Sequence, residues 1–311
     1  MNSNNSNNDI DVVITYVDGS DPEWIKEYEK YVVTPPSNAR FRSWDTVKYL
    51  LRGIDDCMPW VRNIYLVVMS ESQVPAYIDT SKVKIVYHKD FIPIDILPVF
   101  NSNPIELYLW NIEGLSEYFI YFNDDMIPMR PLQPDDFFEE NSNKARCKTR
   151  IEWNFEVKNV FHQIKKNSTD LAYKASGIEE PSPSIMLSPR HGPNPMLKSY
   201  CKECFKAVES EIIDGLTKIR SGSNATQYLF TNYMYLKGMT DEGEKPMSFK
   251  YDDFGLYNID QVVWHILYPD EKLYCLNDTN DIKSTEMYEE YKNLADAAFE
   301  KYYPNKSKYE L

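Results

Sequence analysis

Long apolar runs, basic residues and cysteine are all scarce in this sequence of 311 residues. No segment approaches the about 18 consecutive apolar residues of a transmembrane helix, and the opening residues MNSNNSNNDI lack both the basic and the apolar region of a secretory signal. Five cysteines at irregular spacing are typical of a reducing compartment. We therefore expect a cytoplasmic protein without a transmembrane segment, in which residues 1–8 form a disordered leader.

Lysine and arginine number 34, against 48 aspartates and glutamates, and the formal net charge is −14. A general nucleic-acid binder needs a basic face to neutralise phosphates, so this composition argues against nucleic acid as a partner. For the same reason, a phosphorylated ligand would require a metal ion or a local cluster of Arg and Lys. Hydrophobic residues make up 42% of the chain, which is enough for a globular core.

Apolar segments alternate with amphipathic ones along the first half of the chain. β-Branched and aromatic runs predict strands, and helical spacing of apolar residues predicts the segments between them. The expected strands are 10–17, 63–69, 83–87 and 118–122, and the expected helices are 23–31, 42–54 and 105–112. This order predicts an α/β fold with a mostly parallel sheet flanked by helices. Further along, we expect helices over 195–213, 227–236 and 284–302 and a strand over 273–276, so the C-terminal part is mainly helical.

Two of the expected strands end in acidic turns. The first runs into VDGSD, and the fourth runs into Asn123, Asp124 and Asp125. Parallel sheets bind ligands beyond the carboxyl ends of their strands, and Mg²⁺ is held by one or two carboxylates together with ligand phosphates. These turns therefore predict a cation site, although solvated acidic turns would have the same composition. Gly19, between Asp18 and Asp21, would let a ligand approach the backbone closely.

Candidate groups for acid–base chemistry and phosphate binding lie in loops. His191 is surrounded by proline and glycine in the segment SPRHGPNPMLK, and a histidine there is either a general acid or base or an ordinary surface residue. Four arginines beside turns are candidates for a bidentate phosphate clamp, each of them weak when taken alone: Arg40, Arg42, Arg190 and Arg220.

Taken together, these motifs resemble the Stealth family, the hexose-1-phosphate transferases of capsular polysaccharide synthesis, whose eukaryotic relative is N-acetylglucosamine-1-phosphotransferase. The resemblance covers most of the chain. It rests on IDVVITYVDGSDPEW, on the long region from RFRSWDTVKYLLRGI to GLSEYFIYFNDDMIPMRPLQPDDFF, on RHGPNPMLK, and on Arg220 with YCLND and YYPNKSKYE.

The resemblance implies a Rossmann-like (GT-A-like) fold with a nucleotide-sugar-binding core over 9–138 and a part over 139–311 that completes the active site. It also implies a nucleotide-sugar donor, commonly a UDP-hexosamine. A hydroxyl of an acceptor saccharide would attack the β-phosphorus, release UMP and form a phosphodiester. The cytoplasmic location expected from the absence of targeting signals leaves peripheral contact with the inner membrane as a further expectation.

The resemblance also assigns roles to residues. The expected catalytic residues are Asp125, His191, Arg42 and Arg220. Mg²⁺ or Mn²⁺ would be held by Asp124, Asp125 and Asp278, and one of the first two or His191 would be the base. The expected substrate-binding residues are Asp18, Gly19, Asp21, Asn101, Asn103, Glu106, Asn123 and Arg190. Two alternatives stay open: a metal-dependent glycosyltransferase that releases UDP, and a non-catalytic sugar-binding scaffold.

Overall fold

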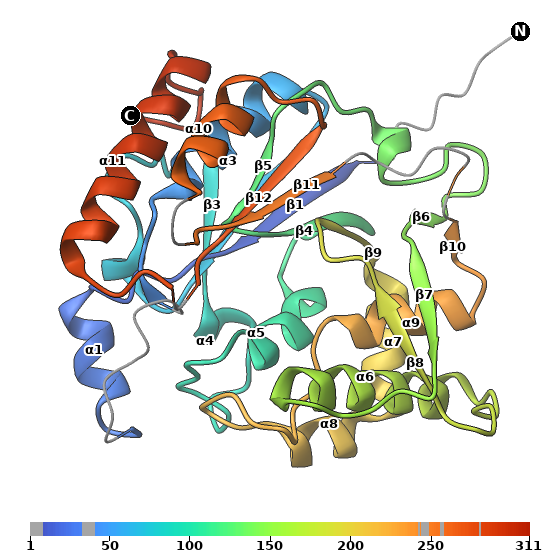
Figure 1. Cartoon of the computed structure of the whole chain (residues 1–311). Coiled ribbons are helices and arrows are strands. Elements are labelled where there is room, and N and C mark those ends of the chain that lie inside the picture. Colours follow the sequence, from blue (N-terminus) through green and yellow to red (C-terminus); the bar gives the residue numbers. More distant parts are fainter. Residues whose placement is uncertain (1–8, 33–40, 242, 244–248, 256–257, 280) are drawn as a thin grey trace, which may run out of the picture.

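The computed structural model describes residues 9–32, 41–241, 243, 249–255, 258–279 and 281–311. Its central sheet has the order β3-β2-β1-β4-β9 (Figure 1). The strands are β1 (Ile10–Thr15), β2 (Ile64–Val68), β3 (Val83–Tyr87), β4 (Tyr118–Asn123) and β9 (Asn194–Leu197). The first four are parallel and β9 is antiparallel to β4, which confirms the predicted α/β fold with a mostly parallel sheet.

The core strands form where the sequence has continuous apolar runs. All five residues of β2 are buried, as are the first five of the six in β1. Such runs are typical of parallel strands that are covered on both faces. β1 pairs in register with β4 from Ile10 opposite Tyr118 to Thr15 opposite Asn123, so the two strands end at the same level. The segments that follow them are therefore neighbours at one edge of the sheet.

A second sheet extends from the end of β4. It has the order β11-β12-β5, with β5 (Met126–Pro128), β11 (Phe249–Asp253) and β12 (Leu273–Asn277). β5 follows Asp125 directly and pairs antiparallel with β12, which brings the chain near residue 275 beside the turn after β4. The described residues also form two small ribbons: β6 (Ala145–Arg146) with β10 (Thr240–Asp241), and β7 (Thr149–Trp153) with β8 (Ile185–Pro189).

Helices cover both faces of the central sheet (Figure 1). α3 (Thr46–Cys57), α10 (Ile259–Leu267) and α11 (Thr285–Tyr302) lie together on one side, where Tyr49 of α3 stacks on Phe299 of α11. The other side carries α5 (Ser102–Tyr108), α6 (Val160–Ser176), α7 (Lys198–Ala207), α8 (Glu209–Gly215) and α9 (Tyr228–Leu236). Two short α-helices elsewhere in the described part of the chain are α1 (Pro22–Tyr28) and α4 (His88–Phe91). None of the helices in the described part of the chain has the length and apolarity needed to cross a membrane.

Several predicted boundaries are wrong. The helix expected over 195–213 is not continuous: residues 194–197 form β9, and separate helices follow it. β9 exists because NPML is fully buried against β4, a tertiary contact that overrides local helix propensity. The helix expected from residue 42 begins at Thr46, after Asp45 in a left-handed conformation with φ of 57°. Residues 1–8, the expected leader, and Arg40 lie outside the described residues.

A buried ion pair ties α3 to the end of the chain. Arg52 makes two hydrogen bonds of 2.9 Å to the carboxylate of Glu310, and these side chains are 6% and 2% exposed. Arg52 also donates to Glu300 and to the Tyr303 carbonyl, each at 2.8 Å. Removing one member of such a pair leaves the other charge buried without a counter-ion.

We expect Arg52→Ala to lower the free energy of unfolding by about 3–5 kcal/mol, measured by urea titration. The matched control is Lys30→Ala. The Lys30 side chain is 55% exposed and pairs with Glu27 on the surface. That substitution should cost less than about 1 kcal/mol. An Arg52→Ala protein as stable as the control would contradict this account of the C-terminal contact.

Candidate active site

A cavity of about 870 Å³ opens beyond the carboxyl ends of β1 and β4. It lies where ligands bind in parallel sheets, and its volume is within the about 300–1,000 Å³ of small-molecule sites. Polar lining residues include Thr15, Asn101, Ser102, Asn103, Glu106, Asn123, Asp124, Asp125, His191, Arg220, Gln227, Asn277 and Asp278. One wall is aromatic, with Trp24, Phe41 and Phe100 packed against one another.

The structure brings together most of the residues predicted for the site. Nine of them line the cavity: Asn101, Asn103, Glu106, Asn123, Asp124, Asp125, His191, Arg220 and Asp278. Arg42 reaches the same place indirectly, because it forms a bidentate pair with Asp278 at 2.8 and 2.6 Å. Four predicted residues do not line it: Asp18, Gly19, Asp21 and Arg190.

Those four residues have structural contacts of their own. Asp21 is buried, caps the N-terminus of α1 through the Glu23 amide, and accepts hydrogen bonds from Ser72 and Gln73. Asp18 accepts from Ser20 in a local turn. Gly19 donates its N–H to the Phe41 carbonyl, and a Cβ there would collide with Phe41, so this glycine is needed for packing. Arg190 is exposed and lies over the Phe249 ring.

The carboxylates after β4 are held in a poorly solvated position. Burial, and then the neighbouring Asp125, raise the pKa of Asp124 to about 7. Burial also raises the pKa of Asp125, an effect partly offset by electrostatic interaction with His191 and by the hydrogen bond from Cys275. Asp125 Oδ2 accepts a 3.5 Å contact from the Cys275 thiol, whereas Oδ1 is buried and has no hydrogen-bond partner among the described residues.

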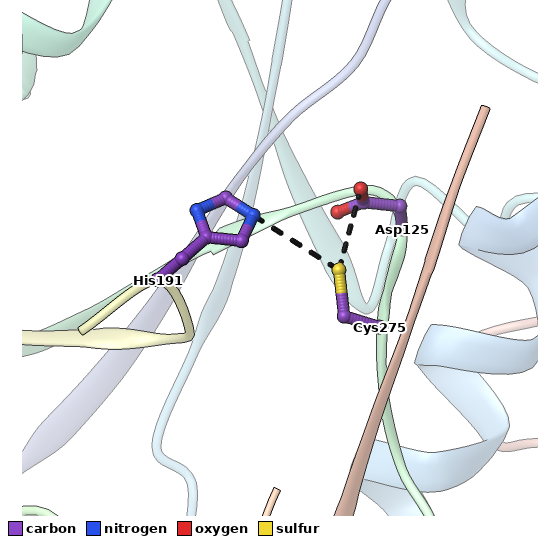
Figure 2. A group of neighbouring side chains, drawn as sticks. All are labelled: Asp125, His191 and Cys275. Carbon is purple, nitrogen blue, oxygen red and sulfur yellow. Dashed lines mark hydrogen bonds between the residues drawn. The ribbon is translucent and has the colours of Figure 1, made fainter. Parts of the chain in front are cut away.

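His191 faces Asp125 and Cys275 across the cavity edge (Figure 2). The Cys275 sulfur lies 4.0 Å from His191 Nε2, and the Tyr228 hydroxyl lies 3.5 Å from Nδ1. The imidazole itself is on an exposed residue of the loop between β8 and β9. A loop-borne histidine with one nitrogen directed to a cavity can exchange protons with a bound ligand.

Unpartnered buried polar atoms gather at this cavity. The described part of the chain has ten buried side-chain nitrogen or oxygen atoms without a hydrogen-bond partner. Five of these ten belong to residues that line the cavity, namely His88 Nδ1, Asn103 Nδ2, Asp125 Oδ1, Arg220 Nε and Gln227 Oε1. Each such atom costs about 1–3 kcal/mol, so their concentration at one place indicates a site built for a polar ligand.

Of the three residues predicted to hold a divalent cation, the two at the end of β4 fit that role. Asp125 Oδ1 offers a free, buried acceptor, and Asp124 adds a second carboxylate with a pKa that a nearby cation would lower. Asp278 fits less well, because Arg42 occupies both of its carboxylate oxygens. Asp124 and Asp125 are therefore the residues best suited to hold Mg²⁺ or Mn²⁺.

Comparison with known proteins places the sequence in a family. Residues 8–32 match the family model for conserved region 1 of Stealth proteins, and residues 40–146 match that for conserved region 2. The capsular polysaccharide phosphotransferase WcwK of Streptococcus pneumoniae is 32% identical over 98% of this chain and 100% of its own length. The receptor polysaccharide phosphotransferase WefC of Streptococcus oralis is 30% identical over 90% of this chain and 93% of its own. The chain belongs to the Stealth family.

Both relatives of this Stealth protein are named phosphotransferases, which confirms the expected enzyme class, a transferase, at the level of the family. Among solved structures, the galactosyltransferase LgtC in complex with donor and acceptor sugar analogues covers 92% of this chain. It is 12% identical with a TM-score of 0.41, too low for an argument about ligands or activity.

Several residues around the Stealth site were not predicted from the sequence. Cys275, Gln227, Tyr228 and His88 lie at the cavity or against its polar groups, and none was predicted to do so. Gln227 and Tyr228 begin a largely buried aromatic helix, so their pattern predicts core residues. Cys275 lies in the short apolar segment LYCL, and only the pairing of β12 with β5 brings it to Asp125.

His88 predicts a pH dependence of stability. Burial lowers the pKa of this imidazole from 6.5 to about 4. Between those pH values the unfolded chain binds a proton that the folded chain does not, so stability falls as pH decreases from 6.5 towards 4. Over the whole range, His88 lowers the free energy of unfolding by about 3 kcal/mol.

We expect His88→Gln to lose less stability than the parent over this pH range, measured by urea titration at pH 7, 5.5 and 4.5. Other titrating groups are common to both proteins and cancel in the difference. His162→Gln, at a half-buried histidine in the first turn of α6, is measured in parallel as the control for the loss of a histidine. Parallel curves for the parent and His88→Gln would contradict the prediction.

Proposed function

We propose that this protein transfers hexose 1-phosphate, an N-acetylhexosamine 1-phosphate, from a UDP-sugar to a hydroxyl of a saccharide acceptor. UMP is the leaving group, and the product is a phosphodiester in a capsular or other surface polysaccharide. The observation that carries the proposal is the group of unpartnered buried polar atoms around the cavity beyond β1 and β4. The names of the relatives support the same class of reaction.

The cavity combines groups that a pyrophosphate needs. A protein with a net charge of −14 repels such a ligand unless positive charge is supplied locally. Arg220 contributes an unpartnered Nε and is oriented by a 3.0 Å hydrogen bond to Ser102. When bound at Asp124 and Asp125, Mg²⁺ or Mn²⁺ would supply charge stabilisation for the transferred phosphoryl group.

The charge of Arg42 has a different use. Its guanidinium is bound to Asp278 and lies over the rings of Trp44 and Tyr288, at 5.7 and 5.0 Å. Held in this way, Arg42 fixes Asp278 at the cavity edge and neutralises it. We infer that the Arg42–Asp278 pair shapes the edge of the cavity without binding phosphate. Arg220, by contrast, would contact a phosphate directly.

His191 is the proposed general base. The acceptor hydroxyl must lose a proton as it attacks phosphorus, and a base within hydrogen-bond reach accelerates that step. His191 Nε2 points toward Asp125 and Cys275 at the cavity edge, and Tyr228 lies at the other nitrogen (Figure 2). The proton of the acceptor would move to Nε2, and the Asp125 carboxylate would stabilise the imidazolium that results.

Other residues of the cavity are suited to contact the sugar and the nucleobase of the nucleotide-sugar donor. Asn103 Nδ2 and Gln227 Oε1 offer a free donor and a free acceptor to hydroxyl or amide groups. Glu106 Oε2, by contrast, accepts hydrogen bonds from the Thr226 hydroxyl and the backbone N–H of Gln227, so we infer that Glu106 positions Gln227. The rings of Trp24, Phe41 and Phe100 give a flat apolar surface for a sugar or base face.

The released nucleotide decides the reaction. Purified protein is incubated with a panel of nucleotide sugars, an oligosaccharide acceptor and Mg²⁺, and the nucleotide products are separated and identified. UMP from a UDP-sugar, formed only when acceptor is present, is the expected result. UDP as the primary product would assign attack at the anomeric carbon and a glycosyltransferase, and donor binding without any turnover would assign a sugar-binding scaffold. A cytoplasmic location with peripheral membrane contact stays a prediction.

A further inference from the structure

Three side chains with different ligand atoms converge at the edge of the cavity (Figure 2). Asp125 follows β4, His191 lies in the loop before β9, and Cys275 is in β12. One ligand atom from each lies within 4.8 Å of the other two. The Cys275 sulfur is 3.5 Å from Asp125 Oδ2 and 4.0 Å from His191 Nε2.

These three ligand atoms (a carboxylate oxygen, an imidazole nitrogen and a thiol sulfur) differ from those of a magnesium site. Mg²⁺ takes oxygen ligands in octahedral geometry, whereas a thiolate and an imidazole favour Zn²⁺ and similar borderline ions. Zinc bonds of about 2.0–2.3 Å in a tetrahedron place ligand atoms about 3.3–3.8 Å apart. The two separations from the Cys275 sulfur, 3.5 and 4.0 Å, are close to these values, and the His191 and Asp125 ligand atoms, which lie within 4.8 Å of each other, would move closer together around a zinc ion.

We propose that Asp125, His191 and Cys275 form a binding site for Zn²⁺ and related borderline divalent ions, and that occupation of this site stops sugar-phosphate transfer. The fourth position would be open to water or ligand, as in other three-residue zinc sites. Binding converts the Cys275 thiol to a thiolate and releases its proton to solvent. The metal site is independent of the proposed function, whereas the inhibition rests on it.

The surroundings support the site. The Tyr228 hydroxyl lies 3.5 Å from His191 Nδ1, where metal-bound histidines usually have an outer partner that orients the ring. Asp125 Oδ1 is buried without a hydrogen-bond partner among the described residues, so its carboxylate has a free position beside the one that faces Cys275. Metal on His191 Nε2 would occupy the lone pair that the general base needs, which explains the expected inhibition.

Cobalt provides the direct test, because a thiolate bound to Co²⁺ gives a charge-transfer absorption band in the near ultraviolet. Full-length, reduced, metal-free protein is titrated with Co²⁺ in the absence of Mg²⁺ and substrate. We expect a band that saturates at one equivalent and that disappears when Zn²⁺ is added. Cys275→Ser should abolish the band. His191→Ala changes an exposed loop residue and should weaken binding by more than the about 10- to 100-fold that an outer-shell change costs.

A matched control uses the other thiols. Cys201 and Cys204 are both buried on α7, and Cys201→Ser/Cys204→Ser should retain the band. Absence of the band in the parent, or its persistence in Cys275→Ser, would overturn the site. In a separate assay, micromolar Zn²⁺ should inhibit the parent, and inhibition of Cys275→Ser should need at least tenfold more zinc, relative to its own zinc-free rate. If the zinc-loaded parent kept full activity, the inhibitory role would be wrong, but the zinc site itself would stand.

Discussion

Asp125→Asn is expected to lower kcat for sugar-phosphate transfer by at least about a thousandfold. A cation held beside a transferring phosphoryl group is worth several kcal/mol of transition-state stabilisation, and each 1.4 kcal/mol is about tenfold in rate. The substitution keeps the shape of the side chain and removes the charge that would hold the ion. It also removes the carboxylate that faces His191 and Cys275.

Two measurements separate this effect from loss of structure. Donor affinity, measured by calorimetry, should fall in Asp125→Asn when Mg²⁺ is present and should change little when Mg²⁺ is absent. The melting temperature should stay the same or rise, because burial raises the pKa of Asp125 and a neutral amide relieves that cost. Asp260→Asn, an exposed carboxylate in the first turn of α10, should keep parental turnover. Near-parental turnover of Asp125→Asn would remove the basis for a cation at this position.

The sheet and much of the cavity could be predicted because their signals are local. Continuous apolar runs identify β1, β2 and β4, and parallel pairing then places the residues after β1 and β4 at one edge. The acidic turn at Asp124 and Asp125 follows from that rule without any knowledge of distant contacts. β3 was predicted with its observed bounds for the same reason.

The parts that could not be predicted depend on long-range contacts. Nothing local in NPML distinguishes a strand from the start of a helix, because β9 forms only through its pairing with β4. Cys275 meets Asp125 through an antiparallel pairing of segments about 150 residues apart. Arg42 and Asp278 are even further apart, 236 residues along the chain, and their pairing gives each a partner inside the protein where a ligand was predicted.

The turn after β1 shows a different kind of ambiguity. Asp18, Gly19 and Asp21 have the composition of a ligand-binding loop, yet their hydrogen bonds go to the protein itself. Asp residues cap helices and form tight turns by the same oxygen chemistry that binds cations. Composition alone cannot distinguish these uses, and the direction of the hydrogen bonds does.

His191→Gln is the second substitution with a large expected effect. If His191 is the general base, kcat should fall by about 10²- to 10⁴-fold. Donor affinity should stay within about threefold of the parent, because the base contacts the acceptor hydroxyl and adds no binding energy to the nucleotide. The residue is exposed in a loop, so the variant should fold normally, as circular dichroism and melting temperature would show.

Comparison of kcat with donor affinity distinguishes a base from a substrate-binding residue. A base contributes to the rate and not to nucleotide binding, so His191→Gln should lower kcat alone. Tyr228→Phe removes the hydroxyl 3.5 Å from Nδ1 and keeps the imidazole, so it should cause a smaller loss of kcat than His191→Gln. If donor affinity and kcat fell together in His191→Gln, His191 would be a substrate-binding residue, and Asp124 or Asp125 would take the role of base.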